Sequence, residues 1–139
     1  MPIIRIDGCS PDVYSIIAPL AMDPAVIRKR RNLPIVTKEN YTWHVLKKGK
    51  KVKAFVGEER LANYTKLQAF VVLDANDEEL QTFLEEVVTR FEKSPSPMLT
   101  ASVLNEYAVL FGKAKFQVTG YKTNWTDLAI VKHEGIHRS

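Results

Sequence analysis

Residues 67–104 carry the pattern that most restricts how this chain can fold, an amphipathic helix between two apolar runs. The helix is predicted from apolar side chains that recur every three or four residues, as on the buried face of a helix: Leu80, Phe83, Leu84, Val87, Val88 and Phe91. The runs "LQAFVVL" before it and "MLTASVL" after it are short and mostly apolar, which is typical of strands inside a sheet. A strand that returns through a crossover helix lies parallel to the next strand. We therefore expect 67–74 and 98–104 to be parallel strands.

The remaining segments predict an α+β fold with a mixed sheet. "PIIRI" is a first strand, and "SPD" and "DP" begin two helices. "YTWHVL" and "KVKAFVG" form a hairpin that turns at Gly49. "NEYAVLFGKA" is a short helix capped by Asn105, and "FQVTGY" and "DLAIVK" are a last pair of strands. The order is β-α-α-β-β-β-α-β-α-β-β, in a single domain over 1–132 with a tail at 133–139.

Composition narrows the class of protein. The chain has 139 residues, 45% of them hydrophobic and 26% charged, which is ordinary for one globular domain. No apolar run approaches the roughly 18 residues that cross a membrane, and the N-terminus lacks the pattern of a secretion signal. Cys9 is the single cysteine, which suits a reducing compartment. We expect a cytoplasmic protein that does not enter a membrane.

The order of elements resembles that of the GNAT superfamily of acyl-CoA-dependent N-acetyltransferases along nearly the whole chain. The local likeness is strongest in "LTASVLNEYAVLFGKAKFQVTGYKTNWTDLAIV", where a strand leads into a short helix that ends "LFGKAKF" and then into another strand. The resemblance implies a mixed sheet flanked by helices, with the two parallel strands splayed apart at their C-terminal ends. It also implies acetyl-CoA as cofactor and an amine-bearing acceptor.

The resemblance places CoA in the splay, against backbone groups of residues 70–73 and the start of the 77–92 helix. Its contacts would then include Val71, Val72, Leu73, Asn76 and Asn105. Family members hold the pyrophosphate in a loop rich in arginine and glycine, and "NDEELQ" (76–81) stands in that place. Carboxylates there oppose an anion and also stabilise the first turn of a helix, with Asn76 or Asp77 as its N-cap. We therefore expect this corner to have lost the pyrophosphate-binding loop of the family.

The resemblance also implies a tyrosine that protonates the departing thiolate, and Phe111 occupies its aligned position. Tyr107, four residues earlier on the same face, is the remaining phenol, either as this acid or as a buried aromatic. Glu58, Glu59 and Asp74 are candidates by location for a general base, and we take Glu58 as the first of them. Trp125 and Tyr121 either line a substrate pocket or cap the core.

A second hypothesis is a non-catalytic domain of the same fold that binds a protein or a nucleic acid. Two basic segments would carry that contact: Arg28, Lys29, Arg30 and Arg31 in one, and Lys47, Lys48, Lys50 and Lys51 in the other. "HEGIH" (133–137) matches the H-E-x-x-H pattern of zinc proteases, but Gly135 lies inside it and the sequence ends at Ser139. We expect no metal site there.

Overall fold

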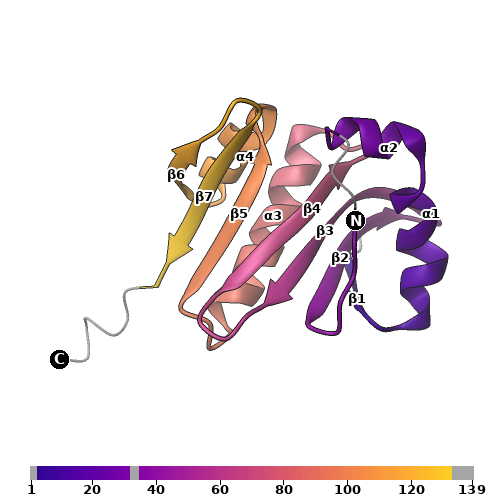
Figure 1. The fold of residues 1–139 in the computed structure, drawn as a ribbon, viewed down its shortest axis with the longest axis horizontal. Coiled ribbons are helices and arrows are strands. Elements are labelled where there is room, and N and C mark those ends of the chain that lie inside the picture. The colour runs from indigo at the N-terminus through magenta and orange to yellow at the C-terminus, as the bar shows by residue number, and fades with distance from the viewer. Residues whose placement is uncertain (1–2, 32–34, 133–139) are drawn as a thin grey trace.

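The computed structural model describes residues 3–31 and 35–132 of the chain. Seven strands form one sheet in the order β1-β2-β3-β4-β5-β7-β6. All neighbouring strands are antiparallel except β4 and β5, which are parallel. The strands are β1 (Ile3–Asp7), β2 (Tyr41–Lys48), β3 (Lys51–Arg60), β4 (Thr65–Val72), β5 (Met98–Leu104), β6 (Gln117–Tyr121) and β7 (Trp125–Val131). The predicted mixed sheet and its parallel pair are confirmed (Figure 1).

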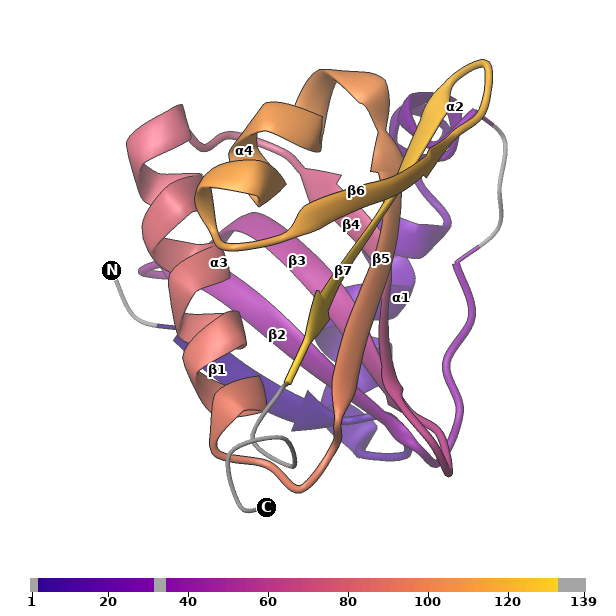
Figure 2. The same cartoon turned by 90° about the vertical axis from the view of Figure 1, so that its left-hand side faces the viewer.

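Helices cover both faces of the sheet. They are η1 (Val13–Ile17), α1 (Ala18–Ala21), α2 (Pro24–Lys29), α3 (Asp77–Glu92), η2 (Asn105–Tyr107) and α4 (Ala108–Lys113). Figure 2 shows α3 and α4 on one side of the sheet and α1 and α2 on the other. Each side has its own hydrophobic core, the larger one under α3 and α4. The predicted order of elements is confirmed along the described chain.

The helix α3 follows its sequence pattern closely. All six apolar residues of the predicted stripe are buried, and burial of each such side chain stabilises the fold by about 1.5–3 kcal/mol. Its N-terminus is a capping box: the Asn76 side chain accepts from the Glu79 N–H, and the Glu79 carboxylate accepts from the Asn76 N–H. The prediction that Asn76 or Asp77 caps this helix is therefore confirmed for Asn76.

The helix that follows β5 departs from expectation at its start. It begins as the 3₁₀ turn η2, and the Asn105 side chain makes no capping hydrogen bond. Instead its amide donates to the Thr123 carbonyl at 3.0 Å, and its oxygen accepts from the Thr126 hydroxyl at 2.8 Å. Asn105 thus fastens the β6–β7 turn to the end of β5, so the predicted cap at this residue is wrong.

The tail at 133–139, with "HEGIH", lies outside the described residues. No helix within the described ranges is long and apolar enough to cross a bilayer. Within the same ranges, no three His, Cys, Asp or Glu side chains gather as metal ligands would.

Candidate functional site

The strands β4 and β5 part soon after they meet. Their parallel pairing covers only Thr65–Leu67 against Leu99–Ala101. Beyond it β4 continues to Val72, while β5 stays paired with β7 as far as Leu104. The two strands therefore leave an opening between their C-terminal ends, the place where open α/β sheets bind ligands. The predicted splay is confirmed.

A bulge in β4 sets which side chains face which side of this opening. Ala69 has a φ of 54°, and the register with β3 shifts between Phe55 and Gly57. As a result Ala69 joins the core under α1 and α2, while Phe70 joins the core under α3 and α4. Sequence pattern gives no sign of the bulge, because "QAFVV" reads as a continuous buried strand.

Backbone groups of β4 point into the opening. The N–H groups of Leu73 and Asp74 both donate to the Lys53 carbonyl of β3. Successive residues of a strand direct their backbone groups to opposite neighbours, so those of Val72 point away from β3. The Val72 carbonyl accepts from the Lys29 ammonium of α2 at 3.0 Å. Of the predicted cofactor residues on β4, Val72 is thus aimed at the opening, while Leu73 is engaged with β3 and Val71 is buried.

Aromatic rings line the α3–α4 side of this region. Phe70 packs edge-on against Tyr107 and Phe111, with ring centroids 5.2 Å and 5.1 Å away. Phe111, at the position where the resemblance expects a phenol, is fully buried and packs on Phe116. Tyr107 is half-buried, and burial, followed by the charge of Glu106, raises the pKa of its phenol.

Tyr107 also forms part of a hollow of about 480 Å³ between the start of α3 and α4. This hollow is lined by Asp77, Glu78, Gln81, Thr82, Glu106, Tyr107, Val109, Leu110 and Lys113. Among the described residues, no hydrogen bond uses the Tyr107 hydroxyl. The phenol is therefore free to meet a ligand that enters the hollow, and its raised pKa keeps it protonated at neutral pH.

The corner between β4 and α3 is acidic, as the sequence indicates. Asp74 pairs with Lys51 at 2.5 Å and Lys53 at 3.8 Å, and the Lys51 hydrogen bond and charge, with that of Lys53, lower the pKa of its carboxyl. Lys53 also lies 3.9 Å from Glu79. Asp77 and Glu78 are exposed and form no ion pair among the described residues. The two lysines thus compensate Asp74 and Glu79 and leave Asp77 and Glu78 without an ion-pair partner among the described residues.

This corner does not fit a CoA pyrophosphate. A pyrophosphate needs several free N–H donors, close backbone approach and a positive field. Here the Asn76 side chain already uses the Glu79 N–H, glycine is absent from 76–81, and the unpaired charges are negative. At the end of β4, the Val72 carbonyl is already engaged by the Lys29 ammonium.

The predicted base candidates fall on different faces. Glu58 lies on the α3 side, buried, and lines a cleft near the β3–β4 turn rather than the opening. Glu59 lies on the other face, also buried, and accepts hydrogen bonds from the side chains of Gln68 and Asn40. Side chains alternate between the two faces of the sheet along β3, so the adjacent residues Glu58 and Glu59 lie on opposite faces.

A second hollow, of about 240 Å³, lies at the opening on the α1–α2 face. Its lining is Arg30, Lys66, Leu67, Gln68, Ala69, Ser102, Lys122 and Trp125. Trp125 therefore lines a pocket, one of the two alternatives expected for it, whereas Tyr121 is 77% exposed and caps no core. Arg30 turns inward here, and burial lowers the pKa of its guanidinium more than Tyr41 raises it. Sequence reasoning placed Arg30 on a basic surface segment because its neighbours are all basic.

Comparison with known proteins identifies the architecture. No family model matches the sequence, and no curated protein sequence matches it. Among solved structures, the GNAT domain of S. lividans PAT superposes with a TM-score of 0.69 at 14% identity. The match covers 94% of this chain and 89% of that chain. The Escherichia coli ribosomal-protein-S18-alanine N-acetyltransferase gives a TM-score of 0.67 at 17% identity, over 94% of each chain.

A third similar structure contains a ligand. The Campylobacter jejuni N-acetyltransferase PseH, solved in complex with acetyl coenzyme A, has a TM-score of 0.59 at 10% identity, over 95% of this chain and 100% of that chain. At these identities the likeness establishes the fold. The chain has a GNAT-like α+β fold, as its order of elements predicts.

Proposed function

We propose that this chain is an N-acyltransferase that accepts an acyl thioester in the opening between β4 and β5. The observation that carries the proposal is the three-residue pairing of these strands, after which β4 runs on with backbone groups directed at the gap. One hollow lies at this gap on the α1–α2 face, where an amine can approach, and Tyr107, which packs against Phe70 of β4, lines a second hollow between α3 and α4.

Two side chains are placed for proton transfer. Tyr107 presents a protonated phenol on the α3–α4 side, where a thiolate leaving group needs a proton. Glu59 is a buried carboxylate on the α1–α2 side, joined to the opening by its hydrogen bond from Gln68. Glu59 therefore replaces Glu58, the base predicted first, because Glu58 faces a different cleft.

The acyl donor that we propose is a thioester of pantetheine. We expect acetyl-CoA to serve as a donor that binds more weakly. The thioester supplies the acyl group, and its pantetheine arm matches the open edge of β4. The nucleotide end of CoA must pass the acidic corner, where two uncompensated carboxylates repel it. We expect acetyl-pantetheine to bind at least as tightly as acetyl-CoA, a comparison that calorimetric titration makes directly.

The activity is tested by following thiol release from acetyl-pantetheine in the presence of a panel of primary amines. Tyr107→Phe is expected to slow release about a hundredfold, the usual scale of a lost general acid. Tyr121→Phe removes an exposed phenol from β6 and serves as the matched control. Equal rates for the two variants, or no amine-dependent release by the unaltered protein, would contradict the proposal.

A second candidate function rests on where the basic segments lie. Lys29 reaches the Val72 carbonyl, and Lys51 reaches Asp74 two residues further on. The α2 end and the β2–β3 turn therefore meet at one end of β4, where Arg28, Lys48 and Lys50 are also exposed. A nucleic acid bound there should show a log–log salt slope near −0.9 per phosphate neutralised. A flat salt response would exclude this candidate.

A further inference from the structure

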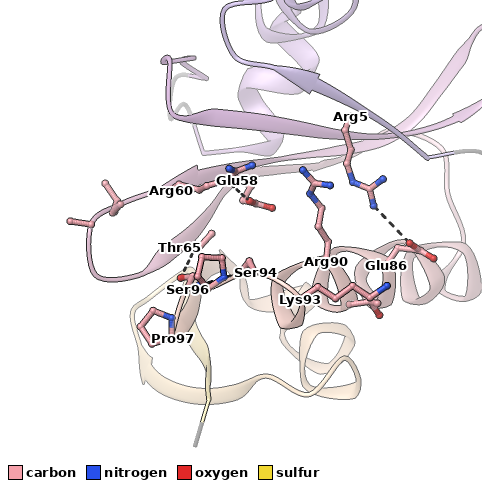
Figure 3. Close-up of a pocket in the computed structure, with 14 residues that line it drawn as sticks. Arg5, Glu58, Arg60, Thr65, Glu86, Arg90, Lys93, Ser94, Ser96 and Pro97 are labelled. Carbon is pink, nitrogen blue, oxygen red and sulfur yellow. Dashed lines mark hydrogen bonds and ion pairs between the residues drawn. The ribbon is translucent and has the colours of Figure 1, made fainter. Parts of the chain in front are cut away.

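A hollow of about 650 Å³ lies away from the opening, beside the β3–β4 turn. Its walls are the C-terminal half of α3, the strands β1 and β3, and the loop that leads into β5 (Figure 3). A volume of this size is typical of small-molecule sites. The acyltransferase proposal uses none of its side chains.

Cationic side chains reach this cleft from three separate elements. Arg5 comes from β1, Arg60 from the end of β3, and Arg90 and Lys93 from the last turn of α3 and the residue after it. Figure 3 shows Arg5 entering the cleft from β1 and Arg90 entering it from α3, with Arg5 joined to Glu86. Favourable interaction with the helix C-terminus accounts for basic residues on α3 but not for those on the two strands.

Two carboxylates oppose these four cations. Glu86 lies 3.8 Å from Arg5, and Glu58 lies 3.4 Å from the Arg60 Nε. Arg90 and Lys93 form no ion pair within the described residues. The cleft thus holds an excess of two positive charges.

The Glu58 carboxylate is held by neighbouring side chains in the wall of the cleft, so its charge is not free to repel an anionic ligand. It is buried, and its Oε1 lies 2.8 Å from the Nε2 of His44, which is also buried. Its second oxygen faces Arg60. Its carboxylate oxygens contact His44 and Arg60, and the charge of Arg90 also acts on it, whereas the Arg90 guanidinium and the Lys93 ammonium make no hydrogen bond within the described residues.

We propose that this cleft binds a small molecule through a phosphate monoester group. Such a group carries close to two negative charges at neutral pH, which matches the excess charge of the cleft. Guanidinium groups bind phosphate oxygens in pairs, and Arg5 and Arg90 enter the cleft from two different walls, β1 and α3. This site is separate from the acyltransferase opening and does not depend on that activity.

Inorganic phosphate and phenyl phosphate are the probes, titrated at constant ionic strength while amide and arginine Nε–H resonances are followed by NMR. The expected result is saturable shifts confined to Arg5 and to residues 58–65 and 86–97. Arg90→Gln is expected to weaken binding about tenfold, which corresponds to about 1.4 kcal/mol. Lys115→Gln, at the end of α4, makes the same charge change outside the cleft and should leave the affinity unaltered.

Circular dichroism of each variant checks that the fold is retained, and Lys93→Gln, at a second exposed cation of the cleft, should also weaken binding. Equal weakening by Arg90→Gln and Lys115→Gln would show a general charge effect and overturn the proposal. Shifts spread over basic residues outside the cleft, or linear shifts without saturation, would overturn it as well.

Discussion

The Nε2 of His44 lies 2.8 Å from the Oε1 of Glu58, and both side chains are buried beneath α3. The bond joins β2 to β3 across the sheet. Burial raises the pKa of Glu58, but the His44 hydrogen bond, together with the charges of His44, Arg60 and Arg90, outweighs it and lowers the pKa below the ordinary 4.5. Glu58 is therefore ionised in the folded protein at any pH near neutrality.

Glu58→Gln should lower the free energy of unfolding by about 2 kcal/mol at pH 7, the scale of a hydrogen bond to a charged group. A carboxyl whose folded pKa is depressed stabilises the fold above its unfolded pKa, and this stabilisation is lost as pH falls through the folded pKa. The gap between the variant and the unaltered protein should therefore narrow from about pH 4.5 downward. Urea denaturation at several pH values measures it.

Glu39→Gln is the control for this experiment, because Glu39 is exposed and makes no described contact. A gap that stayed constant between pH 7 and pH 3 would show that the carboxylate charge of Glu58 contributes nothing to stability.

Lys115→Gly should raise the free energy of unfolding by about 1 kcal/mol. Lys115 has a φ of 82°, a left-handed conformation that costs a residue with a Cβ about 1–2 kcal/mol. It stands where α4 ends, with the Phe116 N–H bonded to the Phe111 carbonyl and the Lys115 N–H to the Gly112 carbonyl, which is the Schellman arrangement. Its exposed ion pair with Glu92 offsets little of the gain.

Lys115→Ala separates the backbone effect from loss of the ion pair, since alanine keeps the Cβ. Thermal unfolding should rank glycine above both lysine and alanine at this position. If alanine stabilised the protein as much as glycine, the backbone explanation would fail.

Asn105→Ala should cost about 2 kcal/mol, because it leaves the hydroxyl of the buried Thr126 and the Thr123 carbonyl without their partner. Asn105→Ser tells this role apart from helix capping. Serine caps helices as well as asparagine does but is too short for both bonds to the turn. Denaturant unfolding should find the serine variant nearly as unstable as the alanine variant, and a full rescue by serine would favour the cap.

The fold could be predicted where one physical signal dominates. The α3 stripe and its flanking apolar runs predict the parallel pair because burial of one helix face leaves no other compact solution. Asn105 was misjudged because the same amide that caps helices also binds strand turns, and only the position of Thr126 decides between them. The β4 bulge at Ala69 has no local signal, since alanine is not a residue that favours a positive φ.

The sites depend on topology and so were harder to predict. Glu58 and Glu59 are adjacent in sequence, yet the pleat sends one to the cleft and the other to the opposite face. Arg5, Arg60 and Arg90 are far apart along the chain, and only the sheet order brings β1 and β3 under the end of α3. Local motif reasoning detects consecutive basic residues but not a cleft of this kind.

The last prediction concerns the acidic corner. Asp77→Asn combined with Glu78→Gln should tighten CoA binding by roughly thirtyfold, because each removes a repulsion of about 1 kcal/mol from the pyrophosphate. Pantetheine binding should change far less than CoA binding, because that arm carries no charge, although Asp77 and Glu78 also line the hollow at Tyr107. Calorimetric titration of both ligands with both proteins is the measurement. Glu39→Gln combined with Glu85→Gln makes the same change in net charge away from the corner and serves as the control.

Replacing "NDEELQ" by a glycine-rich segment with one arginine should tighten CoA binding further, by adding free N–H donors and a cation. Each interior glycine costs about 1 kcal/mol of helix stability, so unfolding of this variant must be measured in parallel. Micromolar binding of acetyl-CoA by the unaltered protein would show that the corner accepts the anion despite Asp77 and Glu78. The preference for pantetheine thioesters would then be refuted, and acetyl-CoA itself would become the donor to assign to the opening.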